Sequence, residues 1–185
     1  MDLLFIGLGN PGKEYENTRH NAGFLLLDEI ASKFEASPYI NKFNAHYSKA
    51  SIAGHKVHLL KPQTYMNLSG RSVLQALTFY KIKPNCMWVF HDDIDLETGR
   101  IKVKIGGGNG GHNGLKSIDE VMGKEYHRVR IGVGKPLFGE VSDYVLQNFS
   151  ITEMEKMKKT FDNVTNNIKL LITDTSDKFL NKISL

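Results

Sequence analysis

The chain has 185 residues, 41% of them hydrophobic and 24% charged, which is ordinary for a globular protein and predicts a single domain spanning residues 1–185. The formal net charge of +4 permits an anionic partner without requiring one. No apolar stretch approaches the roughly 20 residues that cross a bilayer, no signal peptide is recognisable, and Cys86 is the only cysteine. We therefore expect a cytoplasmic protein without disulfides or membrane contact.

Strand-like and helix-like segments alternate along the chain. A capping box of Ser150 and Glu153 opens the last clear helix, and the segment after residue 173 gives no clear pattern. The alternation predicts an α/β fold, a single-domain three-layer sandwich with a mixed twisted sheet and helices on both faces. The expected strands are 3–6, 45–53, 56–60, 87–90, 100–105 and 127–133, and the expected helices are 22–34, 72–80 and 150–171.

A glycine-rich turn, Gly-Leu-Gly-Asn-Pro-Gly at 7–12, follows the first strand and leads to Tyr15 and the polar run 18–21. The glycine spacing also fits a dinucleotide-binding turn. However, Pro11 removes a backbone donor, and the helix that should begin at the last glycine is delayed. The acidic residue expected about 20 positions later is also missing from a second strand. We therefore favour a turn that binds another polar ligand, with a plain tight turn as the alternative.

Three further polar motifs follow strands, where open α/β sheets place their binding crevices. In residues 61–70, Asn67 either faces a ligand or caps the next helix. In residues 91–95, three carboxylates suggest a metal site or a solvated acidic turn. In residues 106–114, the many glycines indicate either a closely approached backbone or a flexible surface loop.

His20 and His112 are the two histidines that lie in polar, glycine-containing loops. An imidazole beside a carboxylate is enough to activate water, because the carboxylate fixes the tautomer and stabilises the imidazolium. Asp92 or Asp93 could supply that carboxylate, and asparagine amides could stabilise a developing oxyanion.

Period 2 places Arg100, Lys102 and Lys104 on one face of the strand 100–105, next to the glycine loop, and Arg128 and Arg130 on one face of the strand 127–133. These cations form either a solvated sheet face or a patch that binds phosphate.

Four blocks of sequence resemble the bacterial-type peptidyl-tRNA hydrolases. That family carries Gly-Leu-Gly-Asn-Pro-Gly with Tyr and Thr-Arg-His-Asn, Lys-Pro-x-Thr-[Phe/Tyr]-Met-Asn-x-Ser-Gly, His-Asp-[Asp/Glu]-[Ile/Leu]-Asp, and a glycine run ending in His-Asn-Gly-Leu-Lys-Ser. The matching segments here are 7–21, 61–70, 91–95 and 106–117, in the same order, and together they span about residues 5 to 150. Tyr65 stands where phenylalanine is frequent, and we see no departure at a catalytic position.

The resemblance implies a monomeric enzyme that hydrolyses the ester between a peptide and the 3′ end of tRNA, with no metal and no cofactor. It implies that His20 is the catalytic base, that Asp92 orients it, and that His112 and the glycine loop form part of a gate. The remaining implied contacts are Asn10, Tyr15, Met66, Asn67, His112 and Asn113 for the substrate, and Lys102, Lys104 and Arg130 for the tRNA backbone.

Two other functions stay open on the sequence. One is a non-catalytic RNA-binding relative, which loss of His20 or Asp92 would have favoured, and both residues are present. The other is a dinucleotide-dependent oxidoreductase, which a test of NAD(P) binding would detect.

Overall fold

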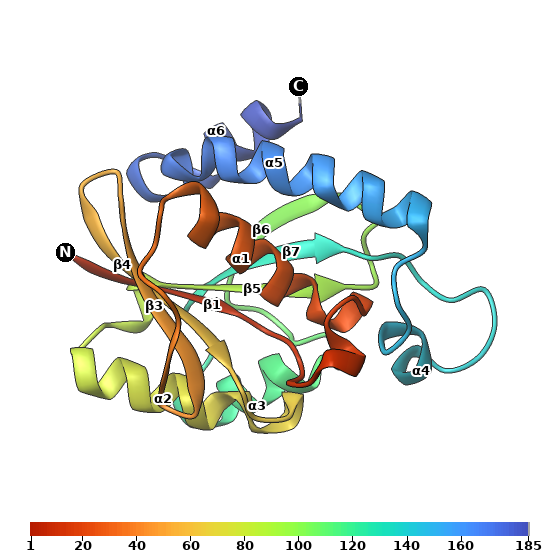
Figure 1. Ribbon diagram of the computed structural model, residues 1–185, viewed down its shortest axis with the longest axis horizontal. Coiled ribbons are helices and arrows are strands. Elements are labelled where there is room, and N and C mark those ends of the chain that lie inside the picture. Colours follow the sequence, from red (N-terminus) through yellow and green to blue (C-terminus); the bar gives the residue numbers. More distant parts are fainter. Residues whose placement is uncertain (185) are drawn as a thin grey trace.

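The computed structural model describes residues 1–184, which form a seven-stranded sheet with helices on both faces (Figure 1). The strand order is β2-β3-β4-β1-β5-β7-β6. Neighbours among β4, β1, β5 and β7 are parallel, whereas the two outer strands on one side and β6 on the other are antiparallel. The strands are β1 (Asp2–Gly7), β2 (Ile40–Lys42), β3 (Ala45–Ile52), β4 (His55–Pro62), β5 (Met87–Asp93), β6 (Ile101–Ile105) and β7 (His127–Gly132).

Helices α1, α5 and α6 cover one face of the sheet, and α2 and α3 cover the other (Figure 1). The α-helices are α1 (Ala22–Lys33), α2 (Ser69–Tyr80), α3 (Asn113–Met122), α4 (Val141–Val145), α5 (Ile151–Thr173) and α6 (Ser176–Ile183). Short 3₁₀ turns are η1 (Lys13–Tyr15), η2 (Arg19–Asn21), η3 (Met66–Leu68) and η4 (Pro84–Cys86). The expected fold class is confirmed. None of the helices in residues 1–184 is both long enough and apolar enough to span a membrane.

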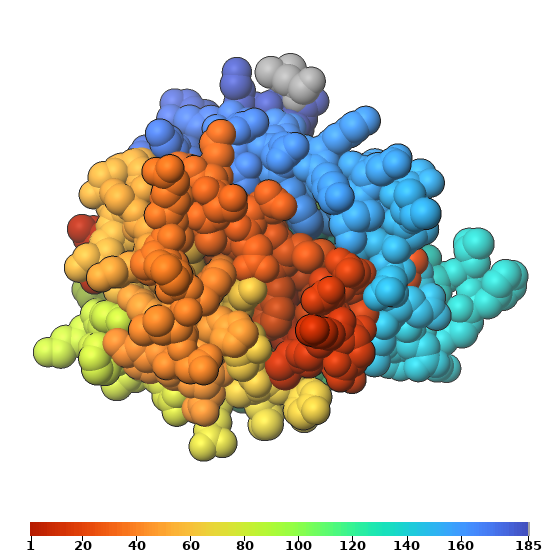
Figure 2. Space-filling model, viewed as in Figure 1, coloured from red at the N-terminus to blue at the C-terminus, as the bar shows by residue number. Residues whose placement is uncertain are grey.

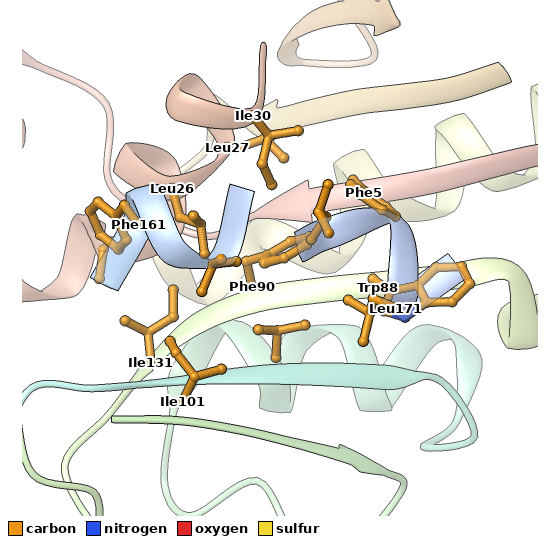
Figure 3. Packing of buried hydrophobic residues seen from close by; sticks show 14 of the residues in the cluster. Phe5, Leu26, Leu27, Ile30, Trp88, Phe90, Ile101, Ile131, Phe161 and Leu171 are labelled. Atoms are coloured by element: carbon orange, nitrogen blue, oxygen red, sulfur yellow. The ribbon is translucent and has the colours of Figure 1, made fainter. Parts of the chain in front are cut away.

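The sheet separates two hydrophobic clusters because successive strand side chains point to opposite faces. On β1, Leu3 and Phe5 pack under α1 and α5, whereas Leu4 and Ile6 pack against α2 and α3. Figure 3 shows the first cluster, in which Phe5 and Phe90 lie between the sheet and the covering helices. A strand buried on both faces reads as a continuous apolar run, which is why the run at 3–6 was recognisable.

The first glycines of the 7–12 turn are explained by packing. A Cβ atom on Gly9 would lie 2.6 Å from the Phe24 ring, and one on Gly7 would collide with the main chain of Gly23 in α1. The segment after Gly12 forms η1 and η2 before α1 begins, so no helix starts at the last glycine. This backbone does not have the geometry of a dinucleotide-binding turn, in which a helix N-terminus faces the phosphates.

The structure differs from the sequence prediction in several elements. Strand β5 continues to Asp93, because residues 91–93 keep pairing with β7. Residues 91–93 are therefore part of a strand, and the prediction of a solvated acidic turn over 91–95 is wrong for them. Helix α2 begins at Ser69, earlier than predicted. The prediction missed the short elements β2 and α4, the terminal α6, and helix α3, which follows directly from the glycine loop.

The carboxyl ends of β1, β4, β5 and β7 meet at one edge of the sheet, because these strands run parallel. The segments that leave this edge include the turn with η1 and η2, the turn with η3, and the end of β5. Such an edge is where open α/β sheets bind their ligands.

Candidate active site

A cavity of about 550 Å³ opens at this edge of the sheet. Its wall combines polar groups at the strand ends with apolar groups from η3 and α4. The polar lining includes Asn10, His20, Asn67, Asp92, His112 and Asn113, and the apolar lining includes Tyr65, Met66, Val141, Val145 and Leu146. The segment that joins β7 to α4 (cyan) projects from the body of the molecule (Figure 2).

Asp92 lies between two histidines. Its carboxylate oxygens are 2.9 and 3.0 Å from Nδ1 of His20, and Oδ1 is 2.8 Å from Nε2 of His112. Asp92 is only 3% exposed. The residues alone allowed Asp92 or Asp93 as the partner of His20, the family resemblance implied Asp92, and the structure brings Asp92 to His20. Asp93 points elsewhere and accepts a hydrogen bond from Nε of Arg130 at 2.8 Å.

Hydrogen bonding assigns the protons on both rings. Nδ1 of His112 accepts the main-chain N–H groups of Gly114 and Leu115 at 3.1 and 3.4 Å, so His112 is the N-cap of α3. The His112 proton is therefore on Nε2, which donates to Asp92. A carboxylate can only accept, so Nδ1 of His20 carries a proton, and Nε2 of His20 keeps its lone pair on the cavity side.

The charge of Asp92 controls the protonation of this group. Burial lowers the pKa of His20, but the charge of Asp92 and its hydrogen bond outweigh burial and raise the pKa above 6.5. Burial raises the pKa of Asp92, but the two histidines outweigh it and hold that pKa far below its usual range. Burial and the nearby His112 lower the pKa of His91 to about 3, so His91 stays neutral.

Asn10 is held by a reciprocal pair of hydrogen bonds with Asn21. Its main-chain N–H donates to Oδ1 of Asn21 at 2.8 Å, and Nδ2 of Asn21 donates to its carbonyl at 3.0 Å. Oδ1 of Asn10 accepts the main-chain N–H of Met66 at 2.9 Å. These bonds fix the side-chain amide so that Nδ2 is the group available to a ligand in the cavity. The sequence showed Asn21 in the same motif but gave no reason to expect this supporting contact.

The other predicted substrate residues fall in different positions. Asn113 is the first residue of α3 and lines the cavity, as do Met66 and Asn67. Asn67 is exposed, and its side chain makes no capping bond to η3 or α2, so the capping alternative is wrong. Tyr15 is half-buried on η1 and is not among the described residues that line the cavity.

The predicted cations lie on the α3 side of β6 and β7. Lys102 pairs with Arg130 and Lys104 with Arg128 in the antiparallel register. Arg128 is fully buried and donates to Asp119 and to the carbonyl of Gly108, so it supports α3 and the glycine loop and is not part of a surface patch. Nζ of Lys104 also donates to the carbonyl of Gly108, at 3.1 Å. Lys102 is exposed.

Burial lowers the pKa of Lys104, and the neighbouring guanidinium groups of Arg128 and Arg130 lower it further. Crowding of positive charge at this face makes an anion a favourable neighbour. Arg130 remains partly exposed, and its ion pair with Asp93 links this face to the cavity, which Asp93 lines.

Within residues 1–184, one group of side chains has the arrangement of metal ligands, namely His20, Asp92 and His112, whose ligand atoms lie within 4.8 Å of one another. The sequence suggested a metal site from the carboxylates of 91–95 instead. Asp93 and Asp95 are paired with Arg130 and Lys135. A metal between the histidines would take the place of the hydrogen bonds that now join both rings to Asp92.

Comparisons with known proteins identify relatives of the chain along nearly its whole length. The peptidyl-tRNA hydrolase family model matches residues 4–184. Peptidyl-tRNA hydrolases from Rickettsia africae and Rickettsia prowazekii are 52% and 53% identical, in each case over 98% of this chain and over 100% and 99% of the relative. A crystal structure of peptidyl-tRNA hydrolase from Acinetobacter baumannii superposes with a TM-score of 0.92 at 41% identity, and the match covers 98% of this chain and 93% of that one.

Proposed function

This chain belongs to the peptidyl-tRNA hydrolase family, and from that premise we propose that it hydrolyses the ester between a peptide, or an N-blocked amino acid, and the 3′ end of tRNA. The observation that carries the proposal is the buried Asp92 carboxylate 2.9 Å from Nδ1 of His20, which leaves Nε2 of His20 as a base at the cavity. An ester is activated enough that a water molecule deprotonated by an imidazole suffices as the nucleophile.

The reaction follows from the proton positions. Nε2 of His20 removes a proton from water as the water oxygen attacks the ester carbonyl carbon. Asp92 stabilises the imidazolium that forms, in the manner that a carboxylate supports a histidine base. The tetrahedral intermediate collapses by breaking the bond to the ribose oxygen, and the imidazolium returns its proton to that oxygen. The products are a free carboxylic acid and tRNA, and His20 is neutral again.

We assign the oxyanion contacts to amide groups at the cavity. Nδ2 of Asn10 is fixed by the bonds of its own oxygen and main chain, and Asn113 begins a helix, where N–H groups favour negative charge. Asn67 and Met66 contact the substrate from η3. His112 closes one side as part of a gate formed with the glycine loop. Tyr15 contacts the tRNA end from outside the cavity.

We assign the tRNA backbone to Lys102, Lys104 and Arg130. These cations share one sheet face, and the Arg130–Asp93 pair leads from that face to the cavity. Phosphate contacts of this kind fix the register of the substrate without reading its sequence. The proposal includes a cytoplasmic enzyme that acts as a monomer and needs no cofactor.

The direct test is release of N-acetylated amino acids from tRNA by the purified protein, measured with a radiolabelled amino acid. We expect turnover that requires the ester and is insensitive to NAD(P). Tight NAD(P) binding without ester hydrolysis would favour the oxidoreductase, and tRNA binding without hydrolysis would favour a non-catalytic RNA-binding protein.

A further inference from the structure

Arg19, the residue before His20, is only 8% exposed and makes its contacts with α4 and α5. Its NH1 group donates to the carbonyl of Tyr144 at 3.1 Å, and its guanidinium carbon lies 4.0 Å from the centre of the Tyr144 ring. Its NH2 group donates to both carboxylate oxygens of Glu153, at 3.2 and 3.0 Å. One side chain thus carries an ion pair in which a single NH2 group contacts both carboxylate oxygens, a hydrogen bond to a carbonyl, and a cation–π contact.

These contacts join three elements. Arg19 lies in η2 with His20, Tyr144 lies in α4, and Glu153 closes the capping box of α5. The main chain reinforces the connection, because the N–H of Arg19 donates to the carbonyl of Gln147 at 3.1 Å and Thr18 bridges to Asn148. Other side chains of α4, those of Val141 and Val145, form part of the cavity wall.

The Arg19 side chain therefore contacts the main chain of α4, which forms part of the cavity wall, and the next residue in the chain is His20. The N–H of Phe149 also donates to the carbonyl of Asn17, at 3.0 Å, so the η2 turn and the segment after α4 are held together. In contrast, the segment between β7 and α4 carries Leu137 and Phe138 at 92% and 91% exposure, so it packs little against the body. Two side chains anchor α4 by polar contacts: Arg19 contacts the carbonyl and the ring of Tyr144, and the Tyr144 hydroxyl donates to the carbonyl of Val133 at 2.7 Å.

We propose that Arg19 is a positioning residue that fixes the α4 wall of the cavity relative to His20. This inference rests on the proposed function. The ester carbonyl must lie within reach of a water held by His20. The α4 wall that packs against the substrate must therefore keep a fixed distance and orientation relative to the His20 ring. A displacement of about 1 Å in such a site can cost on the order of 10²-fold in rate.

The test compares Arg19→Lys, Arg19→Gln and Glu153→Gln, with Lys158→Gln as a control that removes an exposed charge from α5. Glutamine at 153 keeps a capping-box residue while removing the charge that faces Arg19. The measurements are kcat and KM on N-acetylaminoacyl-tRNA, the pH midpoint of kcat/KM, and thermal unfolding. The assay is run at a temperature at which each variant is folded.

We expect kcat/KM to fall about 10- to 100-fold for Arg19→Gln, less for Arg19→Lys, and about threefold for Glu153→Gln, with the control unchanged. The pH midpoint should not move, because Asp92, which sets the pKa of His20, is untouched.

Wild-type kcat/KM in a folded Arg19→Gln variant would overturn the inference and leave a purely stabilising role. If Arg19→Gln does not fold, wild-type kcat/KM in both Arg19→Lys and Glu153→Gln would overturn it. Failure of the wild-type protein to release N-acetylated amino acids from tRNA would overturn the proposed function itself, whatever Arg19 does, whereas near wild-type turnover in His20→Ala would overturn the role of His20 as the base.

Discussion

At the scale of single residues, Asp92 serves two imidazoles at once. It orients His20, whose free nitrogen faces the cavity, and it accepts from His112, which caps α3 with its other nitrogen. The sequence did not predict that His112 caps α3 and shares the Asp92 carboxylate with His20. These contacts bring together η2, the end of β5 and the start of α3, which are far apart in the chain.

His20→Ala should remove most turnover while leaving tRNA binding intact. A positioned general base typically contributes about 10²–10⁴-fold in rate. Asp92→Asn should lose less, since the imidazole remains but its tautomer and orientation are no longer fixed. Turnover on N-acetylaminoacyl-tRNA and a separate tRNA-binding measurement check both expectations. Near wild-type turnover in His20→Ala would contradict the mechanism.

The pH dependence of kcat/KM should report the effect of Asp92 on the pKa of His20. Asp92 raises the pKa of His20 above 6.5, and the base works only when unprotonated, so activity should fall as the pH drops through a midpoint above 6.5. In Asp92→Asn the charge is gone while burial, which lowers the pKa of His20, remains. The residual activity should therefore have its midpoint at lower pH than in the wild type. A midpoint that moves upward would mean that another group is being titrated.

At the scale of elements, β6 and β7 present the cations, and the structure separates their roles. Lys102 is exposed, whereas Lys104 also holds the carbonyl of Gly108 in the glycine loop, and Arg128 is buried beneath it. Neutralising Lys102 is thus the cleaner probe of tRNA binding, and neutralising Lys104 has a second effect on the loop.

Lys102→Gln should weaken affinity for tRNA substrates and reduce the logarithmic slope of the salt dependence of binding by about 0.7–0.9, the value expected for a single phosphate neighbour. The double variant with Lys104→Gln should reduce the slope by about twice that amount. Hydrolysis of a minimal ester that lacks the tRNA body should stay near wild type in Lys102→Gln. An unchanged salt slope would identify a merely solvated face, and equal damage to both substrates would point to support of the active-site loop.

The sequence predicted the elements whose apolar residues form a continuous run or a periodic stripe, and it missed those fixed by tertiary contacts. The run at 3–6 was recognisable because burial on both faces makes it continuously apolar, and the stripe after Ser150 because burial of one helix face imposes a period. Helix α3 was missed because its cap is an imidazole, which is not a usual N-cap residue, and because glycines precede it. Strand β5 extends through His91 and Asp92 because β7 pairs with them, which no local pattern encodes.

The motifs named nearly all of the residues that line the cavity, but few of their contacts. The residues alone left Asp92 and Asp93 as alternative partners of His20, the family resemblance implied Asp92, and the fold gives the physical reason, since neighbouring strand residues face opposite ways. The apolar wall from α4 and the anchoring by Arg19 carried no sequence signal, because residues 141–146 follow no motif.

At the scale of the whole molecule, the distribution of ligand-type side chains bears on metal dependence. The chain has one cysteine, and its seven histidines are scattered, but the fold brings His20, Asp92 and His112 together. Because both rings already bond to Asp92, we expect hydrolysis to continue in the presence of a chelator. The measurement is turnover with and without EDTA on a small ester substrate, since magnesium also affects the folding of tRNA. Activity abolished by EDTA and restored by a divalent ion would assign a metal to these three residues.

The alternation of β5 has a consequence for the tolerance of insertions and deletions. Phe90 and Asp92 lie on one side of the strand, and His91 and Asp93 on the other. Removing or adding one residue upstream in β5 would exchange these sides and turn the carboxylate away from His20, however well the rest of the sheet survived. The segment between Gly134 and Gly139 packs little against the body, so the sides to which its residues point are not fixed in this way. A library of single-residue indels should therefore retain active members across residues 135–138 and none within Met87–Asp93.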